Sequence, residues 1–183
     1  MSGSYLPRPE EARTKAWQDR LGPRDRLRIG LTWSGNPQHW NDLSRSIPLQ
    51  TLSLIIVGGA DFVSLQKDPK PEDKAILRKR GDIIDLTEHL TDFAETAALI
   101  GCLDLVITVD TSVAHLAAAL GCPTWILLPA VPDWRWLLDR DDSPWYPTAR
   151  LFRQSTTRDY EGVVDRVRTE LVKFIEADRS SRL

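Results

Sequence analysis

Residues 103–123 read LDLVITVDTSVAHLAAALGCP, and this segment constrains the fold more than any other part of the chain. Residues 103–109 form an apolar, β-branched run, which is typical of a strand buried on both faces. Asp110 and Thr111 interrupt this run, and either side chain can cap a helix. Residues 112–120 are rich in alanine and leucine and predict a helix. A buried strand that passes through a polar turn into a helix leaves backbone N–H groups free at the carboxyl edge of a sheet, a geometry suited to phosphate.

The same alternation of apolar runs and helical patterns continues along the chain. Strands are predicted at residues 28–33, 61–66, 83–86, 103–109, 124–128 and 149–152. Helices are predicted at residues 9–21, 48–57, 72–80, 92–100, 112–120 and 160–177. This order predicts an α/β, Rossmann-like parallel sheet of about six strands with helices on both faces.

The predicted elements also divide the chain into three parts. We expect residues 28–177 to form the domain, with a helix and linker at 1–27 before it and a polar tail at 178–183 after it. Ligands of such sheets bind at the carboxyl ends of the strands, so functional residues are expected in the loops that follow them.

Composition excludes several classes of protein. The 183 residues are 42% hydrophobic and 27% charged, with a formal net charge of −2, so no overall positive charge favours nucleic acid or anionic membranes. The sequence has no apolar run of transmembrane length and no signal-peptide pattern at its start. Cys102 and Cys122 both lie in apolar settings, which favours buried thiols over a disulfide or a zinc site. We therefore expect a cytoplasmic protein.

The polar residues after the fourth predicted strand have two interpretations. Thr111 and His115 are four residues apart and share one face at the start of the helix, beside Asp110. Such a site can hold a diphosphate on Thr111 and Ser112, with Asp110 hydrogen-bonded to sugar hydroxyls. Alternatively, Asp110 or Thr111 only caps the helix while His115 packs against a neighbouring loop. The local pattern does not decide between the two.

The loop after the first predicted strand is the second candidate site. Gly35 permits close approach of backbone to a ligand, and Ser34 or Asn36 can donate to phosphate oxygens, with Arg45 adding positive charge. The alternative is an ordinary surface loop with turn-forming Asn and Asp residues. No G-x-G-x-x-G or G-x-x-x-x-G-K-[ST] motif follows the strand, which disfavours a dinucleotide dehydrogenase or a P-loop enzyme.

Several of the seven tryptophans fall in predicted loops at strand ends, namely Trp33, Trp40, Trp134 and Trp136. Exposed aromatic rings in such loops often line a pocket or an interface, and Arg135 between two of them suits phosphate. The alternative is that these rings pin a rigid loop to the domain. We favour this alternative for Trp136 and leave Trp134 open.

Taken together, these motifs resemble a known family. Residues 109–123 fit the pattern V-D-T-S-x-x-H-L-A-A-A-L-G-x-P, which is similar to the signature of the bacterial heptosyltransferases of glycosyltransferase family 9. The resemblance extends to the glycosyltransferase-like C-terminal domain that follows tetratricopeptide repeats in many bacterial proteins. Further similar runs are W-x-G-N-P (33–37), R-S-I-P (45–48), F-V-S-L-Q-K (62–67), D-L-T (85–87) and P-D-W-R-W-L-L-D-R (132–140).

The resemblance implies a fold and a set of site residues. Such transferases have two Rossmann-like domains across a cleft, and this chain resembles the C-terminal, donor-binding domain without the N-terminal acceptor domain. The implied contacts are Asp110 with the donor sugar, Ser34, Gly35, Asn36, Thr111 and Ser112 with the diphosphate, and Gln66, Thr87 and Leu90 with the nucleoside, supported by His115 and Arg45. One departure is Ser112, which stands where heptosyltransferases commonly have glycine.

The leading hypothesis is therefore a nucleotide-sugar-binding domain of an inverting glycosyltransferase, incomplete for catalysis alone. We expect no cofactor and no metal, because helix N–H groups and basic side chains can neutralise the leaving diphosphate. The expected partners are a nucleotide sugar or nucleoside diphosphate, together with a second Rossmann-like domain, a tetratricopeptide domain or a second copy of the chain. A non-catalytic protein-interaction module is the alternative. An epimerase-like phosphosugar enzyme is disfavoured, because the sequence shows no dense set of catalytic acids.

Overall fold

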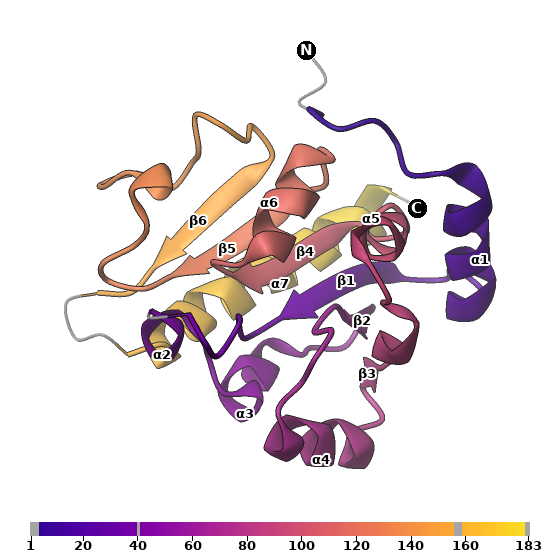
Figure 1. Cartoon of the computed structure of the whole chain (residues 1–183), viewed down its shortest axis with the longest axis horizontal. Coiled ribbons are helices and arrows are strands. Elements are labelled where there is room, and N and C mark those ends of the chain that lie inside the picture. Colours follow the sequence, from indigo (N-terminus) through magenta and orange to yellow (C-terminus); the bar gives the residue numbers. More distant parts are fainter. Residues whose placement is uncertain (1–3, 40, 156–158, 182–183) are drawn as a thin grey trace.

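A single parallel sheet of six strands forms the centre of the molecule (Figure 1). The computed structural model describes residues 4–39, 41–155 and 159–181. The strands are β1 (Leu27–Thr32), β2 (Ala60–Ser64), β3 (Ile83–Ile84), β4 (Leu105–Val109), β5 (Thr124–Leu128) and β6 (Ala149–Arg153). All neighbours pair in parallel, in the order β3-β2-β1-β4-β5-β6. The predicted fold class is confirmed.

Helices cover both faces of this sheet. On one face lie α1 (Glu11–Leu21), α5 (Phe93–Ile100) and α6 (Ser112–Ala119), which form a core with residues of β2 and β4. On the other lie α3 (Leu49–Leu52), a 3-10 turn η1 (Ser53–Ile55), α4 (Pro71–Lys79) and α7 (Glu161–Ser181). Figure 1 shows α5 and α6 on the near side of the strands and α7 behind them. Short pieces within the loops are α2 (Asp42–Arg45), η2 (Thr87–His89) and η3 (Trp134–Trp136).

Burial of the strands explains their apolar composition. Every residue of β4 is buried, and its side chains alternate between the two faces. Leu105 and Ile107 belong to the core beneath α7, whereas Val106 belongs to the core beneath α1 and α5. A strand covered on both faces has no solvent-facing side, so a continuous hydrophobic run replaces the alternating pattern of a half-exposed strand.

Both ends of the chain differ from the predicted division into domain, linker and tail. Trp17 of α1 is fully buried in the core, so the N-terminal helix is an integral part of the domain. Ala12 of the same helix is exposed. Helix α7 continues to Ser181, which places most of the predicted tail in a helix. The last turns contain no proline or glycine that would end a helix.

Among the helices of the described ranges, none has the length and apolar character that a membrane crossing requires.

Candidate functional site

The strand order places a cavity at the centre of the carboxyl edge of the sheet. The chain runs outward from β1 to β3 and then returns to β4 on the other side of β1, which makes the β1–β4 junction a topological switch point. An open cavity of about 670 Å³ lies there. Its lining comes from the ends of β1 and β2 and from the starts of α5 and α6: Thr32, Ser34, Gly35, Asn36, Pro37, Gln38, Arg45, Leu65, Gln66, Lys67, Asp68, Asp92, Phe93, Thr96, Thr111, Ser112 and Val113.

The backbone after β1 is held by side chains from elsewhere. Gln66 accepts hydrogen bonds through Oε1 from the N–H groups of Trp33 (3.2 Å) and Ser34 (3.0 Å). The N–H of Gly35 donates to Oγ of Ser46 at 3.2 Å. Ser34 and Gly35 therefore line the cavity with their N–H groups already engaged in hydrogen bonds. Gln66 was expected near the nucleoside; it lines the cavity, and its carbonyl oxygen also fixes the loop.

Asn36 lines the cavity and also shapes its own turn. Its Oδ1 accepts from the N–H of Gln38 at 2.9 Å, and its backbone carbonyl accepts from His39 at 3.0 Å. This is the local side-chain-to-backbone pattern of a turn, as the alternative of an ordinary loop predicts.

The start of α6 presents backbone N–H groups to the cavity. Thr111 is extended (φ −140°), and no side chain caps the helix, so neither Asp110 nor Thr111 acts as the predicted cap. Thr111 Oγ1 lies 3.3 Å from Oγ1 of Thr108 instead. Ala114 donates to the carbonyl of Thr111 at 3.0 Å, so the N–H groups of Ser112 and Val113 precede this bond of the helix and lie where anions bind.

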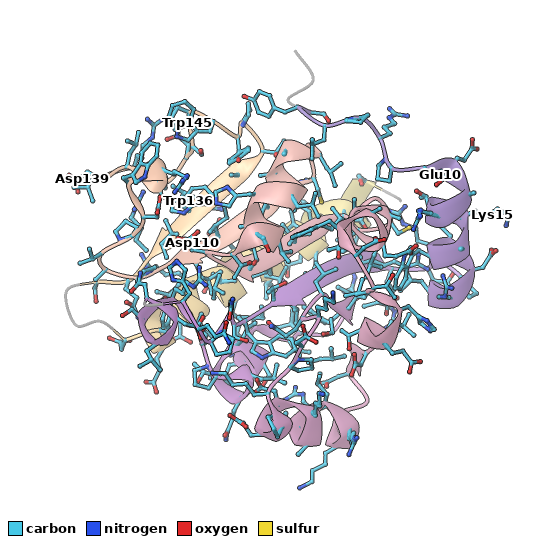
Figure 2. All side chains as sticks on the ribbon, viewed as in Figure 1. Glu10, Lys15, Asp110, Trp136, Asp139 and Trp145 are labelled. Atoms are coloured by element: carbon cyan, nitrogen blue, oxygen red, sulfur yellow. The ribbon has the colours of Figure 1, made fainter. Side chains whose placement is uncertain are left out.

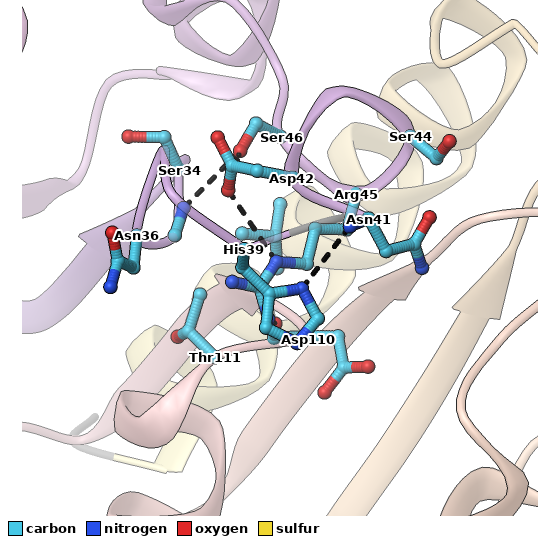
Figure 3. A network of polar contacts seen from close by, with 12 residues as sticks. Ser34, Asn36, His39, Asn41, Asp42, Ser44, Arg45, Ser46, Asp110 and Thr111 are labelled. Carbon is cyan, nitrogen blue, oxygen red and sulfur yellow. Dashed lines mark hydrogen bonds and ion pairs between the residues drawn. The ribbon is translucent and has the colours of Figure 1, made fainter.

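Arg45 brings a cation into the same cavity. Its side chain is 13% exposed, and Nε lies 3.5 Å from Oδ1 of Asp42. Nη1 donates to the backbone carbonyl of Asp110 at 2.9 Å, which connects the loop after β1 with the turn after β4 (Figure 3). Nε is buried and has no hydrogen-bond partner within the described ranges. Nε thus faces the Asp42 carboxylate, while Arg45 as a residue lines the cavity.

A buried hydroxyl of β1 also faces this space. Thr32 is 3% exposed and lines the cavity, and its Oγ1 is buried without a hydrogen-bond partner in the part of the chain that the structure describes. Leaving such a group unsatisfied costs about 1–3 kcal/mol. The Thr32 hydroxyl thus adds a buried polar group to the wall of the cavity.

Asp110 and His115 lie apart from this cavity, so the predicted convergence of four polar side chains is only partial. The Asp110 carboxylate points away from Thr111 and Asn36 (Figure 3), and its Oδ1 is 4.0 Å from Nε2 of His115. His115 Nδ1 lies 3.1 Å from the hydroxyl of Tyr146, and its ring stacks on Trp136 with 5.0 Å between centroids. Figure 2 shows Trp136 and Asp110 on the same side of α6.

This environment also sets the charge of His115. Burial among the aromatic rings lowers the pKa of the imidazole, and the nearby Asp110 carboxylate opposes this effect only in part. The imidazole is therefore neutral at pH 7 and supports the loop through packing and hydrogen bonding. The position of His115 agrees with the alternative interpretation, in which this residue packs against a neighbouring loop.

Two residues expected at the nucleoside do not line the cavity. Leu90 is 1% exposed and packs in the core with Trp17 and Val63, so its side chain cannot reach a ligand. Thr87 Oγ1 donates to Oδ1 of Asp85 at 2.6 Å within the loop after β3. The expected contact of Leu90 is therefore corrected: a leucine at the end of a short loop completes the core.

Phe93 is the lining residue that sequence reasoning placed wrongly. The spacing of Phe93, Ala97 and Ile100 predicts one apolar stripe along this helix, yet Phe93 is 63% exposed and borders the cavity. It is the first residue of the helix, where a side chain can project beyond the packed face. The sequence feature that could have indicated this position is Asp92, immediately before Phe93. The Asp92 carboxylate caps the helix by accepting from the N–H of Glu95, which makes Phe93 the first helical residue.

The tryptophans divide into buried and exposed groups. Trp33 is fully buried, and its Nε1 donates to Asp73 at 2.9 Å, so it does not line a pocket as its loop position had indicated. Trp136 is fully buried, as we favoured. Trp134 is 69% exposed and carries the Arg135 guanidinium over its ring at 4.8 Å. Trp40 lies outside the described residues.

These features define the class: a parallel α/β domain with a polar cavity at its switch point. The model of glycosyltransferase family 9 (heptosyltransferase) matches residues 70–128. Protein FlbA of Caulobacter vibrioides is 29% identical over 177 residues, which cover 91% of this chain and 28% of FlbA.

Two solved structures share the fold. The ADP-heptose lps heptosyltransferase II of E. coli superposes with a TM-score of 0.62 at 21% identity, covering 95% of this chain and 56% of that one. A glycosyl transferase family 9 protein from Veillonella parvula DSM 2008 gives a TM-score of 0.65 at 15% identity, covering 96% and 53%. The chain thus spans about half the length of these structures and little more than a quarter of FlbA.

Proposed function

We propose that this chain is the donor-binding domain of an inverting glycosyltransferase and binds the diphosphate of a nucleotide sugar in the switch-point cavity. One observation carries the proposal: the Arg45 guanidinium, the start of α6 and the unpartnered Thr32 hydroxyl line the same cavity. A cation and free helix N–H groups in one place favour a bound anion. The family match over residues 70–128 includes β4 and the whole of α6, which supports this reading.

The cavity also suits the rest of such a ligand. Its volume of about 670 Å³ is within the range of small-molecule sites, and the exposed ring of Phe93 offers a stacking surface at its border. Lys67 stands at the same border, and its Nζ donates to the carbonyl of Thr91 at 3.1 Å. We place the nucleoside on this side and the diphosphate between Arg45 and α6.

Neutralisation of the diphosphate by Arg45 and helix N–H groups makes a metal ion unnecessary in this proposal. Within the described ranges, no cluster of three or more His, Cys, Asp or Glu residues could hold a metal ion. In this proposal, the positive charge of Arg45 and the helix N–H groups bind the diphosphate without a metal ion. Measuring binding in the presence of EDTA tests this directly.

Calorimetric titration tests the proposal. We expect pyrophosphate and at least one of a panel of nucleoside diphosphates to bind with a Kd on the order of micromolar, unchanged by EDTA. Arg45→Gln should weaken binding at least tenfold, because a charge-assisted contact to phosphate is lost. The matched control is Arg20→Gln on α1, which does not line the cavity and should keep wild-type affinity. Absence of binding across the panel refutes the proposal, and a loss of affinity in EDTA refutes its metal-free form.

A second function is favoured by a different observation. Tyr5, Trp134 and Trp145 are 65%, 69% and 49% exposed and line one apolar groove of about 410 Å³ beside the end of α6. Exposed aromatic clusters of this kind mark interaction surfaces. If the titrations show no ligand, a non-catalytic interaction module is the better description.

A further inference from the structure

The backbone conformation at Gly35 does not require a glycine. Its φ is not among the positive values found at Gly22, Gly59 and Gly121, so a residue with a side chain can adopt its conformation. Its N–H already donates to Ser46, so close approach of a ligand to that group does not explain the glycine either. The reason must lie in the space that a side chain would occupy.

That space is filled by the Arg45 guanidinium. A Cβ built on Gly35 would lie 2.4 Å from Nη2, 2.7 Å from Cζ and 2.8 Å from Nε of Arg45. All three atoms belong to the end of a flexible side chain, so an added methyl group would displace the guanidinium and leave the backbone in place.

The guanidinium is held in this position from several sides. It donates to the carbonyl of Asp110 at 2.9 Å, and Asp42 is 3.5 Å away. Helix α2, which carries Arg45, is itself fixed by the Tyr160 hydroxyl, which donates to the carbonyl of Ser44 at 3.0 Å. Figure 3 shows Arg45 between Asp42 and the turn at Asp110. The arginine thus lies between two loops, in a gap that exists because residue 35 has no side chain.

We propose that Gly35 is a positioning residue that keeps the Arg45 guanidinium at the cavity. This inference rests on the proposed function, in which that guanidinium binds the ligand's diphosphate. It assigns Gly35 an effect through Arg45, whereas the sequence indicated direct contact between the glycine backbone and phosphate. Direct contact with phosphate and an effect through Arg45 predict different effects of Gly35→Ala on affinity in a protein that lacks the Arg45 side chain.

A double-mutant cycle on pyrophosphate affinity separates them. We expect Gly35→Ala and Arg45→Ala each to lower the affinity at least tenfold, and the double variant to bind no more weakly than Arg45→Ala. Gly81→Ala is the matched control, because a Cβ there meets nothing within 4 Å, and it should bind like the wild type. Wild-type affinity in Gly35→Ala, or a further loss when it is added to Arg45→Ala, overturns the inference.

Urea unfolding of the wild type, the two single variants Gly35→Ala and Arg45→Ala, and the double variant tests the contact between Gly35 and Arg45 without any ligand. Arg45→Ala should lower the urea midpoint in the wild-type background, because the bond to Asp110 is lost, and should leave it unchanged in the Gly35→Ala background. Additive shifts overturn the inference. If the wild type binds no pyrophosphate, the proposed function fails, and the unfolding cycle still decides whether Gly35 positions Arg45. Circular dichroism establishes that each variant is folded.

Discussion

Asp110 contributes two groups that act in different directions. Its backbone carbonyl accepts from Arg45 beside the cavity, while its carboxylate, 13% exposed, faces His115 on the other side of the turn. A ligand that extends from the cavity past this turn would meet the carboxylate only with the part beyond its diphosphate. In the proposed function, the turn after β4 would therefore bind phosphate, and the Asp110 side chain would bind sugar.

This separation predicts a selective effect of Asp110→Asn. We expect the variant to lose affinity for an intact nucleotide sugar while its affinity for the bare nucleoside diphosphate stays within twofold. Thr111→Ala is the comparison and should weaken both ligands, because Thr111 lines the cavity at the helix start. Calorimetry with matched ligand pairs measures the difference. Equal affinities in wild type and Asp110→Asn, with the free energy of unfolding lowered by about 1 kcal/mol, would assign the carboxylate a structural role only.

At the scale of residues, the sequence predicted which loops meet but not where each side chain points. Ser34, Gly35, Asn36, Thr111 and Ser112 line one cavity because the carboxyl ends of adjacent parallel strands must lie together. The burial of Leu90 and the exposure of Phe93 could not be predicted, because short loops and helix ends have no repeating pattern of burial.

Among the elements, the end of β1 is tied to α4 by one buried hydrogen bond. Trp33 is fully buried, and its Nε1 donates to Asp73, which is 5% exposed. Trp33 immediately precedes the cavity residue Ser34. The packing of α4 against the sheet therefore fixes the point at which the β1 loop begins.

Removal of this bond should destabilise the domain. Trp33→Phe leaves the Asp73 carboxylate buried without its donor, so we expect the free energy of unfolding to fall by about 1–3 kcal/mol. Urea denaturation measures it, with Trp134→Phe as the control at an exposed tryptophan and an expected change within about 0.5 kcal/mol. Equal changes in the two variants would show that the hydrogen bond contributes nothing.

The strands were more predictable than the short helices. Strands β4 and β5 lie in largely apolar runs and were predicted within two residues of their bounds. Helix α2 was missed, because its four residues, DLSR, are too few to show a helical period. Such a turn forms through contacts with other parts of the chain, among them the bond from Tyr160 to Ser44.

For the whole molecule, we expect binding without turnover. The chain spans 53–56% of the two solved structures whose fold it shares. Sugar transfer requires an acceptor and a base within hydrogen-bond reach of the donor. We expect no release of nucleoside diphosphate when the purified chain is mixed with nucleotide sugars and candidate acceptors. Robust turnover by the monomeric chain would show that no second domain or second copy is needed.

The strand order has a consequence for how the domain folds. Ile29 of β1 pairs with Leu105 of β4. The chain between these two strands, which includes β2, α4, β3 and α5, forms a long loop that must close before they can pair. Closing so long a loop carries an entropic cost before any contact repays it, and non-local pairing of this kind slows folding. A folding intermediate that contains only β1, β2 and β3 has no binding cavity. A ligand that binds in the cavity, as proposed, would bind the native state alone and would raise the stability of the entire domain by mass action.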